Sequence, residues 1–230
     1  MHAGARAHRD APAHGDIPMR ADTHGHGGET ATSAAGTPAL PPAAETHLRH
    51  LLDAYLAIGR DLAADTHAGA AENARAVGAA AQALGGVEMP GRPHFWHERA
   101  GALQAIDEQA GALAAAADLH AARVAYGRLG EALDAILPAT GAPAGYEPAI
   151  YRFVCGMFQD APGGGVWFQQ GAEPRNPFFG SRMLTCYREK TLVPAAGGED
   201  AHHGGMHDRH ETSPDAEEEG SSAHDHGGHR

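Results

Sequence analysis

Four segments of the chain repeat apolar residues at intervals of three and four, the period of an amphipathic helix. These segments cover residues 45–64, 67–84, 94–116 and 119–137. The first shows the pattern most clearly, with Leu48, Leu52 and Tyr55 on one face. Short connections join the four segments, so the pattern predicts an antiparallel four-helix bundle.

Residues that start or stop helices stand at the segment boundaries. Gly85-Gly86 is a C-cap signal for the second helix, and Asp118 is placed to cap the N-terminus of the fourth. Pro138 is expected to end that fourth helix, because proline has no backbone N–H to donate and its ring clashes with the preceding turn.

The character of the chain changes after residue 146. Residues 146–190 contain five of the six Phe and both Cys, and glycines and an Asn-Pro step divide them into short pieces. Residues 150–158 and 166–170 are predicted to be extended. The expected fold class is therefore all-α, a four-helix bundle with a short aromatic and Cys-rich C-terminal appendix that holds a small β element.

Large apolar residues are confined to the middle of the chain. Of the 32 Leu, Ile, Val and Phe residues, 28 lie in residues 46–190. The flanks cannot bury enough apolar surface to offset the entropy of ordering. We therefore expect a disordered His-, Pro- and Ala-rich arm at 1–45, a helical domain at 46–190, and a disordered, acidic, His-rich tail at 191–230.

Charge and motif content exclude several function classes. The formal net charge is −12, with one lysine and no basic stripe, so nucleic acid is not an expected partner. No apolar run reaches the roughly 18–20 residues of a membrane span, and no signal peptide is visible. The chain has no Gly-x-Ser-x-Gly, phosphate-binding glycine loop, His-Glu-x-x-His or Cys-x-x-Cys motif, so it is not expected to be an enzyme.

Two short runs concentrate soft metal donors. Cys155-Gly-Met157 and Met183-Leu-Thr-Cys186 supply two thiols and two thioethers, the donors that select Cu(I) or Ag(I). Residues two apart share a face of a strand, and residues three apart meet on a helical turn. The cysteines could instead form a disulfide worth roughly 3–4 kcal/mol, or stay as buried thiols, and their spacing leaves these alternatives open.

Histidines form a second group of potential ligands. Twelve of the 18 lie in the two arms, where short His-rich tracts bind Cu(II), Zn(II) or Ni(II) weakly and nearby aspartates concentrate cations. The tract residues are His24, His26, His202, His203, His207, His210, His224, His226 and His229. A solubilising arm with incidental histidines is the alternative. His47 with His50, and His94 with His97, lack a third ligand and are expected to be helix-surface or helix-start residues.

The C-terminal motifs resemble a bacterial domain-of-unknown-function family. The matching runs are Phe153-Val-Cys-Gly-Met157, Trp167-Phe-Gln-Gln and Arg175-Asn-Pro-Phe-Phe-Gly-Ser-Arg-Met-Leu-Thr-Cys186. The family pattern is Tyr-Cys-Pro-Met-Ala, Trp-Leu and Arg/Lys-Asn-Pro-Tyr-Phe-Gly-x-x-Met-Leu-x-Cys-Gly, and the resemblance covers residues 46–190. Gly156, Phe158 and Tyr187 depart from it, standing where the family has proline, alanine and glycine.

Members of that family occur as small exported proteins or fused to the C-terminus of periplasmic adaptor subunits of heavy-metal efflux pumps of the resistance-nodulation-division class. The resemblance implies a helical periplasmic domain that handles copper or related metals, with Cys155, Met157, Met183 and Cys186 as ligands. In this scheme Asn176-Pro177 and Gly180 set the turn that returns Met183 and Cys186 to Cys155, and Trp167, Phe178 and Phe179 exclude water.

The expected function is that of a periplasmic accessory protein that buffers or delivers Cu(I), with Ag(I), Zn(II) or Ni(II) as other cargo. Its expected partners are metal ions and an efflux-pump adaptor. A cytoplasmic location stays open, because no leader is visible. The alternative is a helical interaction module, stabilised by a Cys155–Cys186 disulfide, that docks on an adaptor or envelope protein and has no core metal site.

Overall fold

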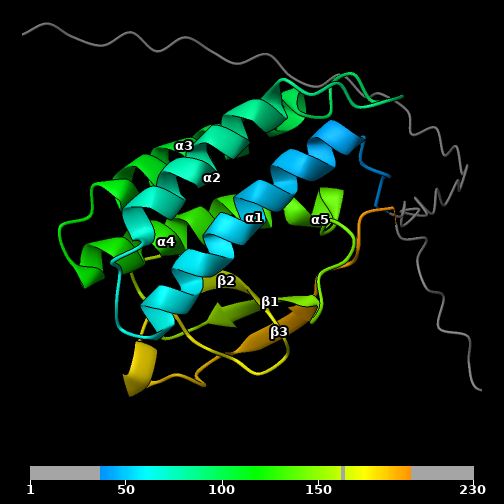
Figure 1. Ribbon diagram of the computed structural model, residues 1–230. Coiled ribbons are helices and arrows are strands. Elements are labelled where there is room, and N and C mark those ends of the chain that lie inside the picture. Colours follow the sequence, from blue (N-terminus) through cyan, green and yellow to red (C-terminus); the bar gives the residue numbers. More distant parts are fainter. Residues whose placement is uncertain (1–36, 162–163, 198–230) are drawn as a thin grey trace, which may run out of the picture. The chain divides into compact units, whose positions relative to one another are not determined.

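The computed structural model describes residues 37–161 and 164–197, which belong to one structural unit. Within these ranges it contains four long helices and three strands (Figure 1). The long helices are α1 (Pro42–Ala63), α2 (Ala70–Gly85), α3 (Ala100–Ala114) and α4 (Leu119–Asp134). The strands are β1 (Ile150–Cys155), β2 (Gly165–Gln170) and β3 (Glu189–Leu192). The shorter helices are η1 (His97–Arg99), α5 (Leu137–Thr140) and η2 (Gly180–Arg182).

The fold is mixed α and β, which corrects the all-α expectation. The four helices and the first two extended segments are confirmed, but β1 pairs antiparallel with both β2 and β3 to give a sheet of order β2-β1-β3. The sequence pattern did not predict the third strand, because β3 is exposed at all four positions. Such a strand has no alternation of apolar and polar residues to reveal it.

Most of the helix boundaries differ from the predicted ones by one to three residues, and the start of α3 differs by six. Asp118 caps α4 as expected, accepting a hydrogen bond from the Ala121 N–H at 2.8 Å. The helix ends at Asp134, however, and Pro138 lies in the first turn of α5, where a missing N–H costs nothing. The third helix begins at Ala100 rather than residue 94, because η1 and turns fill the interval.

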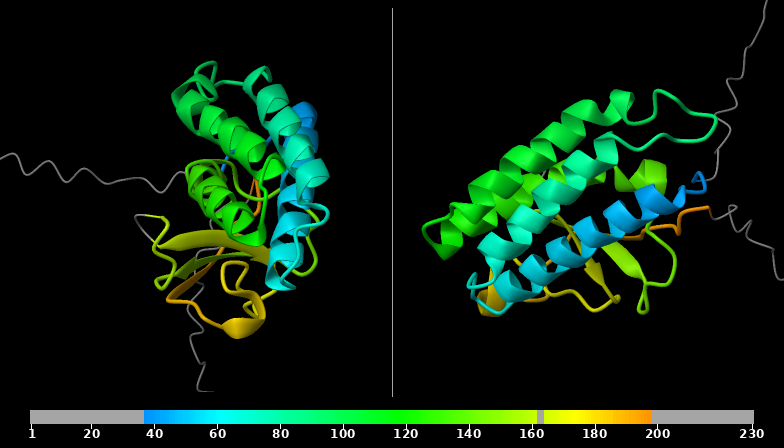
Figure 2. Two further views of the ribbon diagram at one scale, coloured as in Figure 1. Left: turned by 90° about the vertical axis from the view of Figure 1, so that its left-hand side faces the viewer. Right: turned by 45° about the horizontal axis from the view of Figure 1, so that its top comes forward.

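Helices that are consecutive in the chain pack side by side, and the sheet lies against α4 and α1 through β2 (Figure 2). At Gly130 of α4, a Cβ would overlap the carbonyl oxygen of Val166 in β2. The missing side chain therefore lets the helix backbone touch the strand. No helix in the described ranges is both long and apolar enough for a membrane crossing.

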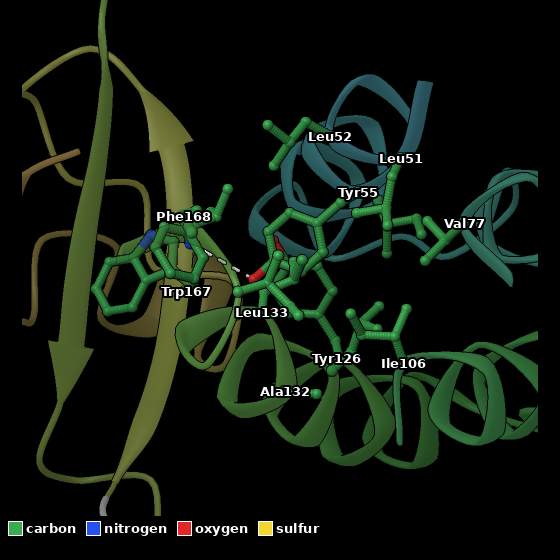
Figure 3. Close-up of a cluster of buried hydrophobic side chains, with 14 of the residues drawn as sticks. Leu51, Leu52, Tyr55, Val77, Ile106, Tyr126, Ala132, Leu133, Trp167 and Phe168 are labelled. Carbon is green, nitrogen blue, oxygen red and sulfur yellow. Dashed lines mark hydrogen bonds between the residues drawn. The ribbon is translucent and has the colours of Figure 1, made fainter. Parts of the chain in front are cut away.

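Side chains from α1, α2, α3, α4 and β2 meet in one apolar core (Figure 3). At its centre the rings of Tyr55 and Tyr126 stack with centroids 4.6 Å apart. The Tyr55 hydroxyl accepts a hydrogen bond from the Phe168 N–H at 3.4 Å. Helix α1 thereby satisfies a backbone donor on the outer edge of β2, where no strand of the described residues pairs with it.

Alternate residues of β1 point to opposite faces of the sheet. Arg152 points to the helices, where its guanidinium makes a two-pronged ion pair with Asp134 of α4. Phe153 and Cys155 therefore belong to the other face, together with Trp167, which pairs with Phe153 in the register. The face that carries Cys155 is thus turned away from the helix layer.

The connection from residue 171 to 188 covers this second face. Phe178 meets Trp167 edge-on with centroids 5.8 Å apart, and Tyr187 meets Phe153 edge-on at 5.5 Å. The segment that carries Cys186 consequently lies over the face of the sheet that carries Cys155. The connection also reaches the helix layer, since the Phe178 ring centroid lies 6.3 Å from the Tyr126 ring centroid of α4.

Candidate functional site

The two cysteines come together although they are distant in the chain. Cys155 ends β1 and is fully buried, Cys186 is partly exposed, and both are free thiols. The Arg188 N–H donates to the Val154 carbonyl at 2.7 Å, which ties the chain after Cys186 to the residue before Cys155. Partial burial raises the pKa of the Cys186 thiol, and electrostatic and hydrogen-bond contact with the Cys155 thiol raises it further.

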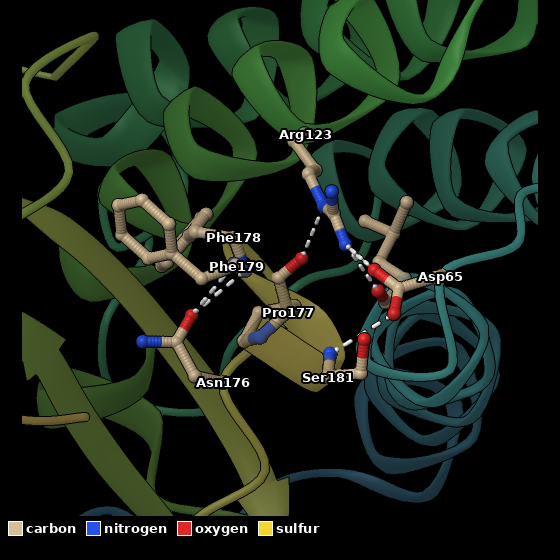
Figure 4. Close-up of polar contacts among 8 residues, drawn as sticks. Asp65, Arg123, Asn176, Pro177, Phe178, Phe179 and Ser181 are labelled. Carbon is tan, nitrogen blue, oxygen red and sulfur yellow. Dashed lines mark hydrogen bonds and ion pairs between the residues drawn. The ribbon is translucent and has the colours of Figure 1, made fainter. Parts of the chain in front are cut away.

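Asn176 holds the Cys186 segment in place. This residue is fully buried, and its side-chain Nδ2 donates to the Cys186 carbonyl at 2.7 Å. Its Oδ1 accepts from the N–H groups of Phe178 at 2.8 Å and Phe179 at 3.3 Å (Figure 4). Its backbone N–H donates to the Leu184 carbonyl at 2.7 Å. The turn expected at Asn176-Pro177 is therefore present. The side-chain amide of Asn176 connects the residues that follow the turn, Phe178 and Phe179, to the segment that carries Cys186.

Aromatic rings pack beside the buried thiol. Phe178 stacks on Phe158 with centroids 4.3 Å apart and lies against Gly165, the register partner of Cys155. A Cβ at Gly165 would overlap the Phe178 ring, so this glycine makes room for it. Trp167 and Phe178 are buried, whereas Phe179 is half-buried. Two of the three predicted aromatic residues thus lie in the interior around Cys155.

The two predicted thioether ligands lie at the surface. Strand β1 ends at Cys155 and a turn follows, so the alternation that would pair Met157 with Cys155 does not extend to Met157. Met157 instead lines a groove of about 280 Å³ with His120 and Arg182. The predicted turn between Met183 and Cys186 is present, with the Cys186 N–H bonded to the Met183 carbonyl at 3.1 Å, but the Met183 side chain is exposed.

A buried arginine that no sequence motif predicted stabilises the same region through hydrogen bonds and an ion pair. Arg123 of α4 is 7% exposed, and its guanidinium donates to the Pro177 carbonyl at 2.8 Å and the Leu62 carbonyl at 3.0 Å. It also forms an ion pair with Asp65 at 2.6 Å (Figure 4). The available signal was its position on α4, three residues before Tyr126 on the apolar face.

Asp65 links this arginine to η2. Its second carboxylate oxygen accepts from the Ser181 N–H at 3.0 Å, and a Cβ at Gly180 would overlap the carboxylate. Hydrogen bonds from Ser181, and next the Arg123 guanidinium, hold the pKa of Asp65 well below its usual range. This one carboxylate therefore joins the turn after α1 to the N-terminal half of α4 and to η2.

Asp65 is expected to make stability depend on pH in acid. Because its pKa is lower in the folded state than the unfolded value of about 4, its contribution is complete above that value and is lost as pH falls towards the folded pKa. Asp65→Asn keeps the left-handed backbone, which has φ 58° and suits asparagine. The variant should be less stable at neutral pH and should lose less stability in acid, as measured by urea unfolding from pH 7 to 2.

Asp160→Asn is the matched control for this prediction. Asp160 is exposed and makes no ion pair within residues 37–161 and 164–197. Its variant should follow the wild-type pH profile. Parallel acid profiles for Asp65→Asn and the wild type would contradict the role assigned to the Asp65 carboxylate.

The metal-binding role predicted for the histidines of the two arms receives no structural test. The rings of His94 and His97 have centroids 6.5 Å apart, and both side chains are exposed. The part of the chain that the structure describes contains no group of three or more His, Cys, Asp and Glu side chains placed to hold a metal ion. The predicted tail ligands, His24, His26, His202, His203, His207, His210, His224, His226 and His229, lie outside the described residues.

Comparison with known proteins assigns no family. No family model, no curated protein and no solved structure matches this chain. The resemblance to the efflux-associated family therefore stays a prediction that rests on the quoted motifs.

Proposed function

We propose that this protein binds a soft metal ion, Cu(I) or Ag(I), through Cys155 and Cys186, and that it buffers or delivers the ion as a periplasmic accessory to metal efflux. One observation carries the proposal. Two free thiols from distant parts of the chain lie together under aromatic cover, held by a fully buried asparagine. The efflux context and the location come from the motif resemblance.

The chemistry of the pair suits a thiophilic ion. Thiolate sulfur is the donor type that favours Cu(I) over hard cations. Metal binding must displace the thiol protons, so the raised pKa of Cys186 means that affinity increases with pH. The rings of Trp167 and Phe178 exclude water and oxidant from the Cys155 side. A bound ion would exchange at the partly exposed Cys186, because Cys155 is fully buried.

The other predicted ligands take outer roles in this proposal. Met157 and Met183 offer thioether donors at the surface around the site, and these bind an ion transiently as it enters or leaves. The arm histidines capture ions loosely and at many positions. The tight site is then the dithiol alone.

Cu(I) competition against a chromogenic chelator tests the proposal on the full chain. The chelator is chosen to remove Cu(I) from imidazole sites. The wild type should retain one Cu(I) ion until this chelator is present at high concentration. Cys155→Ser combined with Cys186→Ser should lose this tight site. Met157→Leu and a double His94→Ala, His97→Ala variant are matched controls that should retain it. Tight binding that survives in Cys155→Ser would contradict the dithiol assignment.

The same contact between thiols favours a second candidate, the disulfide-stabilised interaction module. Thiol titration of the native protein with and without reductant separates the two. A native disulfide, together with failure of the reduced protein to compete with the chelator, would support a module that docks on an efflux adaptor or envelope protein. Two titratable thiols and chelator-resistant Cu(I) would support the metal site.

A further inference from the structure

In residues 37–161 and 164–197, the large apolar side chains that are exposed all lie on the sheet and its connections, and none lies on the four long helices. Within the described residues these are Met157, Met183, Tyr187 and Leu192, between 38% and 57% exposed. Exposed apolar residues that gather in one region mark an interaction surface more often than scattered ones do. Three of the four are within two residues of Cys155 or within three of Cys186, so this surface adjoins the dithiol.

These residues form a strip together with two cationic neighbours. Met157 and Arg182 line the same groove at one end of the strip. Met183 and Tyr187 follow along the connection, and Tyr187 packs on the sheet through Phe153. At the other end, on β3, Leu192 pairs with Tyr151 and the Lys190 ammonium lies 5.7 Å from the Tyr151 ring centroid. We call Met157, Arg182, Met183, Tyr187, Lys190 and Leu192 the exposed strip.

The exposed strip carries two cationic side chains, Arg182 and Lys190, in an acidic protein, and the groove at its Met157 end also contains the carboxylate of Asp160. Residues 181–192 contain Arg182, Arg188 and Lys190 but one carboxylate, Glu189, whereas the chain has a formal net charge of −12. Glu189 is compensated by Arg188 at 3.1 Å and by Arg152 at 3.7 Å. In residues 37–161 and 164–197, neither Arg182 nor Lys190 makes an ion pair.

The C-terminal tail has the complementary chemistry and begins nearby. Residues 198–230 contain nine carboxylates against two arginines, including the run Asp215-Ala-Glu-Glu-Glu219. The last described residue, Gly197, is five positions after Leu192 and is anchored by its N–H to the Pro38 carbonyl at 3.1 Å. Residues 198–230 can span roughly 100 Å when extended, so the strip is within reach. Tethering also gives the tail an effective concentration of order mM.

We propose that the acidic tail, residues 198–230, binds the exposed strip of its own chain. Carboxylates of the tail face Arg182 and Lys190, and the contact shields Met183 and Tyr187 from solvent. Seven histidines of the tail are thereby brought close to Cys186, the partly exposed thiol of the pair. The passage of metal from those imidazoles to the dithiol rests on the proposed function, whereas the docking itself needs no metal.

Hydroxyl-radical footprinting of the full-length, metal-free protein, read by mass spectrometry, tests the docking. At low ionic strength Met183 and Tyr187 should be protected in the wild type, and high salt should increase their oxidation several-fold by screening the charges. A tail variant with Asp215→Asn, Glu217→Gln, Glu218→Gln and Glu219→Gln should show the same increase without added salt. It keeps all tail histidines and both cysteines.

Two further variants complete the test. Arg182→Glu with Lys190→Glu should also remove the protection, since it reverses the charge on the other side of the contact. Neutralising Asp10, Asp16 and Asp22 of the N-terminal arm is the matched control and should leave the protection intact. All these samples are metal-free, so a failure of Cu(I) binding would leave their results unchanged.

Two outcomes would overturn the docking. One is equal oxidation of Met183 and Tyr187 in the wild type and the tail variant at low ionic strength. The other is protection that grows with protein concentration, because a tethered tail protects independently of concentration and a second copy does not.

Discussion

Asn176→Ala is expected to lower the free energy of unfolding by about 3 kcal/mol and to increase the exposure of the Cys155 and Cys186 thiols to solvent. The substitution removes the side-chain partners of the Cys186 carbonyl and of the Phe178 and Phe179 N–H groups. Each buried backbone group left without a partner costs about 1–3 kcal/mol. Urea unfolding under reducing conditions measures the loss of stability, and the rate of maleimide labelling at pH 7 measures exposure of the two thiols.

Asn73→Ala is the control for this effect. Asn73 makes one side-chain bond, to the Gly69 carbonyl at 3.1 Å at the start of α2, so its loss should cost about 1 kcal/mol or less. Thiol labelling should not change in that variant. An Asn176→Ala protein that unfolds as the wild type does, with thiols equally slow to label, would show that this asparagine does not hold the Cys186 segment.

Gly130→Ala is expected to be the most disruptive small change in the helices. The added Cβ would overlap the Val166 carbonyl oxygen and lie 3.2 Å from the Tyr55 hydroxyl. Strand backbone cannot move as a flexible side-chain end can, so overpacking should cost about 2–3 kcal/mol even after the helix propensity gained with alanine. Urea unfolding should show this loss, and near-ultraviolet circular dichroism should change because Tyr55 is displaced.

Gly111→Ala gives the opposite expectation with the same chemical change. Gly111 lies in α3, and a Cβ there meets nothing within 4 Å. The variant should gain about 0.5–1 kcal/mol, because alanine loses less backbone entropy in a helix. If Gly130→Ala and Gly111→Ala shifted stability in the same direction, the close approach of α4 to β2 would not be a constraint in solution.

The helices could be read from periodicity because each buries a stripe formed by neighbours in the chain. Leu48, Leu52 and Tyr55 define such a stripe, and all three are fully buried. Strand β3 offered no comparable signal, since its exposed residues contribute backbone hydrogen bonds rather than side-chain burial. The sequence therefore predicted only a small β element in an appendix to the bundle, whereas β2 packs against both α1 and α4.

For the candidate site, residue types alone identified soft donors and a turn at Asn176, because donor chemistry and local geometry are properties of short segments. Long-range contacts determine which of these donors lie close together. Pairing of β1 with β3 and the amide of Asn176 bring Cys186 to Cys155. The turn after β1 leaves Met157 at the surface. The hydrogen bonds and ion pair of Arg123 also depend on long-range contacts. Its partners at Leu62, Asp65 and Pro177 come from segments whose proximity no local pattern encodes.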